Sequence, residues 1–188
     1  MSTAREALPL YLAMLAGSDR TGYLEARWRR PQGGMGQCFE RTHKLGPLAE
    51  RIVQVGRRTD VYVGCAPRSH RHGGLDAIGS VYALWADCDG SEAARALATF
   101  SPAPTLVIRS GTGENAHAYW QLSGPVSAED ARRANRRLAH ALGADLCATD
   151  PARILRPLSV VGGAWASVLP ACSLADASLN GWWDGDEH

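Results

Sequence analysis

The sequence has no paired cysteine motif, no long apolar run and almost no net charge. Its five cysteines are scattered without any Cys-x-x-Cys spacing, which argues against a disulfide framework and indicates a reduced, cytoplasmic protein. No apolar stretch is long enough to cross a bilayer, and the opening stretch MSTAREALPLYLAMLAG lacks the pattern of a signal peptide. The formal net charge of +1 provides no strong overall field toward nucleic acid or a membrane surface.

Helical and extended patterns are interspersed along the 188 residues, a length that suits one domain with a sizeable core. Helices are expected over 3–17, 45–56, 91–100 and 127–143, and strands over 22–30, 60–67, 80–87, 102–110 and 116–122. Residues 30–37 read as a glycine-rich turn. The helix over 127–143 has the clearest ends, with Ser127 and Asp130 as a weak capping box and Gly143 as its stop. The pattern predicts an α/β or α+β domain with one mixed or antiparallel sheet.

The stretch YALWADCDG, residues 82–90, places Asp87 and Asp89 at the end of an apolar strand. Alternate side chains of a strand share a face, so these carboxylates would lie about 7 Å apart along the chain. Two such charges repel by roughly 4 kcal/mol if ~4 Å separates them near a protein surface. A divalent cation offsets that repulsion, and Mg²⁺ prefers one or two carboxylates with phosphate and water. The pair therefore indicates half of a phosphate-handling metal site; the alternative is a strand that ends in a polar turn.

A glycine loop between two strands follows in VIRSGTGENAHAYWQL, residues 107–122. Gly111 and Gly113 allow backbone N–H groups to turn toward an anion. If the flanking strands form a hairpin, Ser110 and His117 lie near its mouth. The alternative for His117 is a histidine packed in a sheet face.

A third carboxylate comes in GADLCATDPARILRP, residues 143–157. Asp145 follows the helix with the clearest ends, and Arg153 and Arg156 follow soon after. Arginine suits bidentate contact with phosphate. Asp150, which precedes a proline, is better explained as a turn residue.

These three stretches together resemble the archaeo-eukaryotic primase superfamily, particularly the primase-polymerase domains of plasmid and phage replication proteins. The resemblance runs from about residue 22 to 156 and includes RWRRPQGGM and DVYVGCAPR. It implies an α+β fold: an RRM-like antiparallel or mixed sheet backed by helices, with an additional N-terminal αβ unit that completes a catalytic cleft. We expect one domain over 1–158. The tail over 159–188 does not resemble the Pro-Gly-Thr segment with a downstream Asn and Lys that follows in such relatives, and it contains no lysine.

The resemblance implies a template-directed nucleotidyltransferase, a DNA primase or polymerase, in plasmid or phage replication. Its partners would be a single-stranded DNA template, nucleoside triphosphates and a replicative helicase on a separate chain, with no membrane. Mg²⁺ or Mn²⁺ would be the cofactor, and its catalytic ligands would be Asp87, Asp89 and Asp145. The residues expected to bind nucleotide are Arg109, Ser110, Gly111, Gly113, His117, Arg153 and Arg156. The loop between Ser110 and His117 is longer than in many relatives.

Two basic stretches are candidates for nucleic-acid contact. Arg27 and Arg29 would share one strand face, either as a ridge that contacts the template backbone or as the solvated face of a half-buried strand. Arg68 and Arg71 are expected, with His70 and His72, on an exposed basic loop that contacts nucleic acid. A zinc site from Cys65 and the two histidines is the weaker alternative, because structural zinc usually takes four ligands.

Two other functions stay open. One is the same fold without turnover, binding single-stranded nucleic acid during replication initiation, which the divergent tail would favour. The other is a metal-dependent glycosyltransferase that uses the Asp-x-Asp pair on a nucleotide-sugar, although the pattern from Asp145 to Arg156 argues against it.

Overall fold

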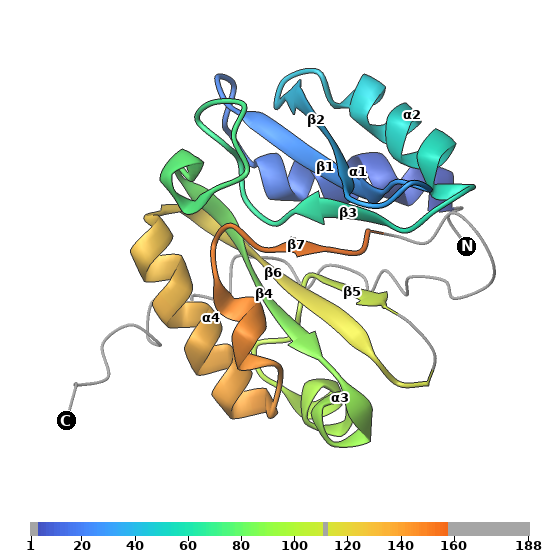
Figure 1. Cartoon of the computed structure of the whole chain (residues 1–188). Helices are drawn as coiled ribbons and strands as arrows, with labels where there is room; N and C mark the ends of the chain where they lie inside the picture. The colour runs from blue at the N-terminus through green and yellow to red at the C-terminus, as the bar shows by residue number, and fades with distance from the viewer. Residues whose placement is uncertain (1–3, 111–112, 158–188) are drawn as a thin grey trace.

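The computed structural model describes residues 4–110 and 113–157 (Figure 1). Its helices are α1 (Ala4–Ala16), α2 (Leu45–Gly56), α3 (Gly90–Thr99) and α4 (Ala128–Leu142), with the short 3-10 helices η1 (Leu75–Ala77) and η2 (Leu146–Thr149). Its strands are β1 (Tyr23–Arg29), β2 (Met35–Arg41), β3 (Val61–Gly64), β4 (Val81–Cys88), β5 (Leu106–Arg109), β6 (Ala116–Val126) and β7 (Ile154–Leu155). The divergent tail expected over 159–188 lies outside the described residues. Within 4–110 and 113–157, no helix has both the length and the apolar character needed to cross a membrane.

The described strands form two antiparallel sheets. One has the order β2-β1-β3-β7 and the other the order β4-β6-β5. In Figure 1 the first sheet lies above with α1 and α2, and the second lies below with α3 and α4. The predicted α+β class with an additional N-terminal αβ unit is confirmed. The elements divide into two sheets where the alternation of patterns suggested one.

Helix α1 joins the two sheets into one core. Its residues Leu8, Leu12 and Leu15 recur at helical spacing and are fully buried. The helix contacts β1 of the first sheet and β4 of the second. At its centre, the hydroxyl groups of Tyr11 and Tyr119 on β6 lie 3.2 Å apart in a hydrogen bond. The position of one sheet therefore constrains the other.

Strand β4 lies at the edge of its sheet and is still buried along nearly its whole length. A buried edge strand needs partners for its free backbone groups. The side-chain oxygen of Asn135 on α4 supplies one, because it accepts a 3.0 Å hydrogen bond from the N–H of Trp85. The Trp85 indole in turn donates to the carbonyl of Ala148, at 2.7 Å. These contacts fix the middle of β4 against α4 and η2.

The predicted ends of the helix over 127–143 are confirmed. The Ser127 hydroxyl accepts a 3.1 Å hydrogen bond from the N–H of Asp130. Gly143 has a φ of +63°, and the next residue, Ala144, donates its N–H back to Ala139. This C-terminal turn reverses the chain toward β4.

Strand β2 lies partly inside the segment expected as a turn. Met35 to Arg41 pairs with β1, and the turn itself is confined to the residues around Gly33 and Gly34, which both have positive φ. A glycine is needed at position 36 within β2, because a Cβ there would lie 2.3 Å from the Trp28 ring. The glycines at positions 33, 34 and 36 made this stretch resemble one turn, although Gly36 belongs to β2 and leaves room for the Trp28 ring.

A buried ion pair connects the first sheet to the segment before β7. Arg68 Nη2 donates to Glu25 Oε2 at 2.9 Å and to the carbonyl of Ala152 at 3.1 Å, and both charged side chains are fully buried. Glu25 also accepts hydrogen bonds from Arg27 and Gln37. Burial alone would raise the pKa of Glu25, but these hydrogen bonds and the Arg68 charge outweigh it and lower that pKa. The prediction that Arg68 lies on an exposed basic loop is wrong, because its guanidinium neutralises Glu25 inside the protein.

Glu25→Ala is expected to reduce the free energy of unfolding by about 3–5 kcal/mol, because it leaves the Arg68 charge buried without its partner. Urea unfolding followed by tryptophan fluorescence measures the change. Since the pKa of Glu25 is lowered, its contribution is present above its ordinary value of 4.5 and is lost as the pH falls through the folded-state value. Glu50→Ala, on the exposed side of α2, is the control, with a change within about 0.5 kcal/mol. Equal stability of the two variants would contradict this role of the pair.

Candidate active site

The structure brings together the three aspartates that the sequence suggested as metal ligands. Asp87 is the second-last residue of β4, Asp89 is the N-cap residue of α3, and Asp145 lies between α4 and η2. The N–H of Asp145 donates a 2.9 Å hydrogen bond to the carbonyl of Asp87. Asp89 lies close enough to both for their charges to affect its pKa. We refer to Asp87, Asp89 and Asp145 as the acidic centre.

His117 on β6 is the cross-strand neighbour of Asp87. Its Nε2 lies 3.3 Å from Asp87 Oδ1, and both side chains are largely shielded, with 5% and 13% of their surfaces exposed. The other ring nitrogen, Nδ1, lies 3.2 Å from the carbonyl oxygen of Arg156. A carbonyl only accepts, so Nδ1 donates to it. The contact with Asp87 is then attractive when Nε2 also carries a proton.

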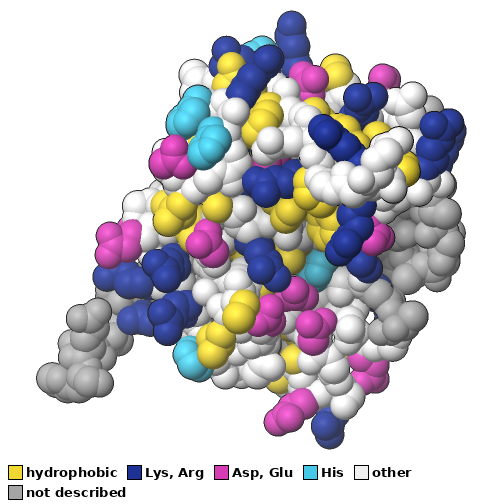
Figure 2. Space-filling view, viewed as in Figure 1, with side chains coloured by type: hydrophobic (Ala, Val, Ile, Leu, Met, Phe, Trp, Pro, Cys, Tyr) yellow, Lys and Arg dark blue, Asp and Glu magenta, His cyan; other side chains and the backbone are white. Residues whose placement is uncertain are grey.

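The two arginines expected to bind phosphate flank this centre on the segment that includes β7. Arg153 Nη2 lies 3.7 Å from Asp145 Oδ2. Arg156 Nη1 donates to the carbonyl of Ser110 at 3.3 Å, and its Nη2 lies 3.4 Å from Asp60 Oδ2. A hydrogen bond with Tyr62 and the charge of Asp60 raise the pKa of Arg156, against the effect of burial. Figure 2 shows acidic side chains gathered directly below basic ones in the middle of this face.

The glycine loop follows β5, beside this segment. Arg109 Nη1 donates to the carbonyl of Gly113 at 3.4 Å, and Gly113 has a φ of +76°. Gly111 lies outside the described residues. The sequence reasoning missed Asn115, whose side-chain oxygen accepts a 2.8 Å hydrogen bond from the N–H of Gly90. This contact joins the loop to the start of α3, and no motif in the sequence indicates it.

The negative charge of the acidic centre is incompletely balanced. Burial raises the pKa of Asp89, and the charges of Asp87 and Asp145 raise it further against the opposing effect of His117. Closely placed carboxylates with excess negative charge are suitable ligands for Mg²⁺ or Mn²⁺.

The carboxylates are not preassembled around a cation position. Among the described residues, their oxygens do not form one of the groups of three whose ligand atoms all lie within 4.8 Å of one another. Asp87 is paired with His117, and Asp145 Oδ1 accepts from the N–H of Cys147 at 2.8 Å. A cation at this centre would therefore compete with His117 for Asp87.

The predicted nucleic-acid contacts differ in accessibility. Arg29 and Arg71 are exposed, and Arg71 lies over the Tyr23 ring at 5.3 Å from its centroid. Arg27 is half-buried, and its guanidinium is bound to Glu25 and to the carbonyl of Gly73. Arg68 is buried and does not face solvent.

Known proteins resemble this chain in fold. The model of the Replicase family matches residues 56–151, just over half of the chain. The AEP domain of the primase-polymerase from cyanophage S-2L is similar with a TM-score of 0.66 and 22% identity, over 89% of this chain and 90% of that one. Primase RepB′ gives a TM-score of 0.60 at 16% identity over 90% of this chain, which spans 57% of RepB′. The catalytic domain of RepB′, solved with initiator DNA, gives 0.60 at 17% identity, over 90% of this chain and 86% of that one.

None of the curated proteins matches the sequence significantly. The structural similarities confirm the predicted resemblance: the chain has the fold of the archaeo-eukaryotic primase superfamily.

Asp89→Asn is expected to keep or increase stability in the presence of a chelator at pH 7. Because the pKa of Asp89 is raised above its ordinary value of 3.8, the folded chain binds this proton more readily than the unfolded chain. The contribution of Asp89 to stability therefore falls as the pH rises through that range, and the variant should lack this fall. Thermal unfolding over a pH series, with Glu50→Gln as control, measures it. A clear loss of stability specific to Asp89→Asn would show that the carboxylate is well balanced in the folded chain.

Proposed function

The chain belongs to the Replicase family, and from that premise we propose that it is a primase-polymerase that joins nucleotides on a single-stranded DNA template. The observation that carries the proposal is the acidic centre, which lies within reach of His117 and Arg153. In this proposal the carboxylates would hold a cation, and the neighbouring imidazole and guanidinium would contact a triphosphate.

The acidic centre would hold one or two divalent cations, Mg²⁺ or Mn²⁺. Such cations stabilise the charge on the attacking and leaving oxygens of phosphoryl transfer. Asp87 and Asp145 are paired here with His117 and Arg153. If these carboxylates turned to a cation, the Arg153 guanidinium would be free to donate hydrogen bonds to triphosphate oxygens, and so would Nε2 of His117 in its doubly protonated form.

The remaining residues would position the nucleotide. Arg156 holds the end of β5 through the carbonyl of Ser110, so it fixes the start of the glycine loop. Backbone N–H groups near Gly113 would contact phosphate oxygens, as in other anion-binding loops. The reaction is attack of a 3′-hydroxyl on the α-phosphate of the incoming nucleotide, with departure of pyrophosphate.

The template would contact exposed basic side chains. Arg29 and Arg71 are accessible for backbone phosphates. Support for DNA comes from the RepB′ catalytic domain, whose structure contains initiator DNA. A replicative helicase on another chain would supply unwound template, as the sequence resemblance implies.

Binding of single-stranded DNA without turnover is the second candidate. It is favoured by the pairing of Asp87 with His117 and of Asp145 with Arg153. These contacts leave the carboxylates apart from one another in this structure. The glycosyltransferase alternative has no support in the fold.

Asp87→Asn is expected to reduce primer synthesis by at least about 100-fold, because a direct metal ligand contributes more than the outer-shell groups whose loss costs about 10–100-fold. The measurement is incorporation of labelled nucleotides on single-stranded DNA with Mg²⁺ or Mn²⁺. Glu129→Gln, an exposed carboxylate on α4, is the matched control and should retain wild-type synthesis.

Product formation that persists in Asp87→Asn would contradict the role of the acidic centre. If the wild-type protein makes no product but binds single-stranded DNA with an affinity that falls with salt, the second candidate is supported.

A further inference from the structure

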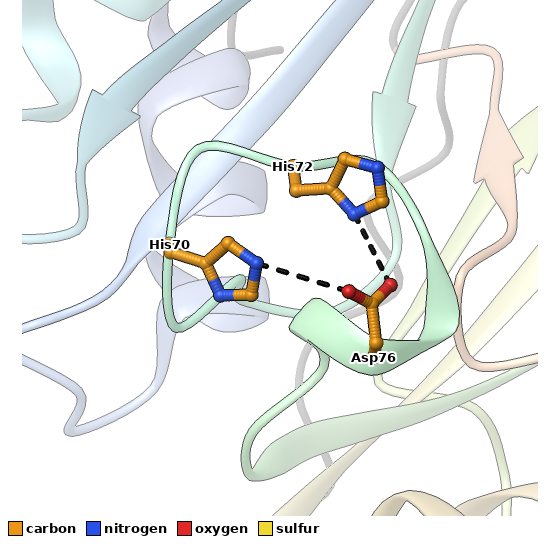
Figure 3. A group of neighbouring side chains, drawn as sticks. All are labelled: His70, His72 and Asp76. Atoms are coloured by element: carbon orange, nitrogen blue, oxygen red, sulfur yellow. Dashed lines mark hydrogen bonds and ion pairs between the residues drawn. The ribbon is translucent and has the colours of Figure 1, made fainter.

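A second cluster of metal-ligating side chains lies on the loop between β3 and β4. His70, His72 and Asp76 converge there (Figure 3), and all three are exposed. Among the described residues they are the group of three whose ligand atoms all lie within 4.8 Å of one another. We propose that this cluster binds one divalent transition-metal cation of the zinc type, at a site separate from the acidic centre.

The carboxylate of Asp76 faces both histidines. Its Oδ1 lies 3.1 Å from His72 Nδ1, and its Oδ2 lies 3.9 Å from His70 Nε2. The two imidazole rings are stacked, with centroids 5.9 Å apart and planes within 4° of parallel. Ligand atoms around tetrahedral zinc lie about 3.3–3.5 Å apart, so small side-chain rotations bring these atoms to a common cation.

The hydrogen bonds of Ser69 determine which nitrogen of His70 faces Asp76 with a free lone pair. The Ser69 hydroxyl donates its one proton to the carbonyl of Ala77, at 3.1 Å. Its oxygen therefore accepts from His70 Nδ1, 3.0 Å away. In neutral His70 the proton is then on Nδ1, and Nε2 presents a lone pair to the carboxylate. A cation between them turns an unfavourable contact into two bonds, and Ser69 serves as the outer partner typical of metal-bound histidine.

The backbone of the loop holds the histidines and Asp76 close together. The N–H of His72 donates to the carbonyl of His70 at 2.8 Å. A Cβ at Gly74 would lie 2.5 Å from Asp76 Oδ1 and 2.7 Å from His72 Cε1, so glycine is needed for their approach. The neighbouring Gly73 accepts a 3.0 Å hydrogen bond from Arg27 through its carbonyl. A bound cation would therefore stabilise the loop beside Arg27.

The donor set selects the class of cation. Two imidazoles with one carboxylate suit zinc and related transition metals, whereas Mg²⁺ takes oxygen ligands. Three protein ligands leave a fourth position for water or another exogenous oxygen. The zinc alternative from the sequence named Cys65 as a ligand, but Cys65 is fully buried, and Asp76 takes the third position in the cluster.

The test is titration of the full chain, freed of metal by a chelator, with Zn²⁺ in a calorimeter and with Co²⁺ in an absorption measurement. We expect one zinc site, weakened at least about 10-fold in His72→Ala and in Asp76→Asn. The site should be unchanged in His140→Ala, an exposed histidine on α4, and in Asp89→Asn of the acidic centre.

The role of Ser69 has its own comparison. Ser69→Ala should weaken zinc binding about 10-fold, whereas Ser80→Ala, an exposed serine before β4, should not. Hydrogen exchange of residues 69–77 should slow when Zn²⁺ is added to the wild-type chain. The same addition to His72→Ala should leave the exchange unchanged. Absence of zinc binding, equal binding by wild type and His72→Ala, or loss of binding in Asp89→Asn would each overturn the proposal.

Discussion

The negative charge at the end of β4 is the constraint on which the site depends, because the strand is buried almost to the point where its carboxylates begin. Asp87 has only 13% of its side chain exposed, and it is balanced on one side by His117. Asp145 approaches from the other side through a backbone hydrogen bond to Asp87, so it adds charge where charge is already costly. Gathering these like charges does not help to stabilise the fold itself. Their arrangement is explained if a cation and a triphosphate share the site.

The short segment around β7 connects this centre to the rest of the molecule. Arg68 donates to the carbonyl of Ala152, and the N–H of Cys65 donates to the carbonyl of Arg153, so the first sheet holds the beginning of the segment. His117 of the second sheet donates to the carbonyl of Arg156, at its other end. Backbone hydrogen bonds thus position Arg153 and Arg156. Their guanidinium groups are not used in these contacts and can bind other partners. The buried Glu25–Arg68 pair stabilises the site from a distance through these contacts.

Local patterns predicted most of the elements and brought the right residues to attention. The apolar run before Asp87, the caps of α4 and the glycine loop are all short-range signals, and each leads to the element that the structure contains. Strand β2 was missed because Gly33, Gly34 and Gly36 resemble one turn, although Gly36 makes room for Trp28. The burial of Arg68 depends on its contacts with Glu25 and Ala152, which are distant in the sequence. The role of Asp76 depends on a loop that folds back and brings it to His70 and His72. Composition indicates neither of these contacts. Asn115 and Asn135 were missed for the same reason: each supports the site through one hydrogen bond that only the tertiary structure defines.

The most direct test of the central claim is the anomalous scattering of Mn²⁺ in crystals of the protein soaked with the ion and a nucleoside triphosphate. We expect a peak bounded by Asp87, Asp89 and Asp145, with triphosphate density next to His117 and Arg153. Crystals that bind the nucleotide elsewhere, or that show no peak at the acidic centre, would contradict it.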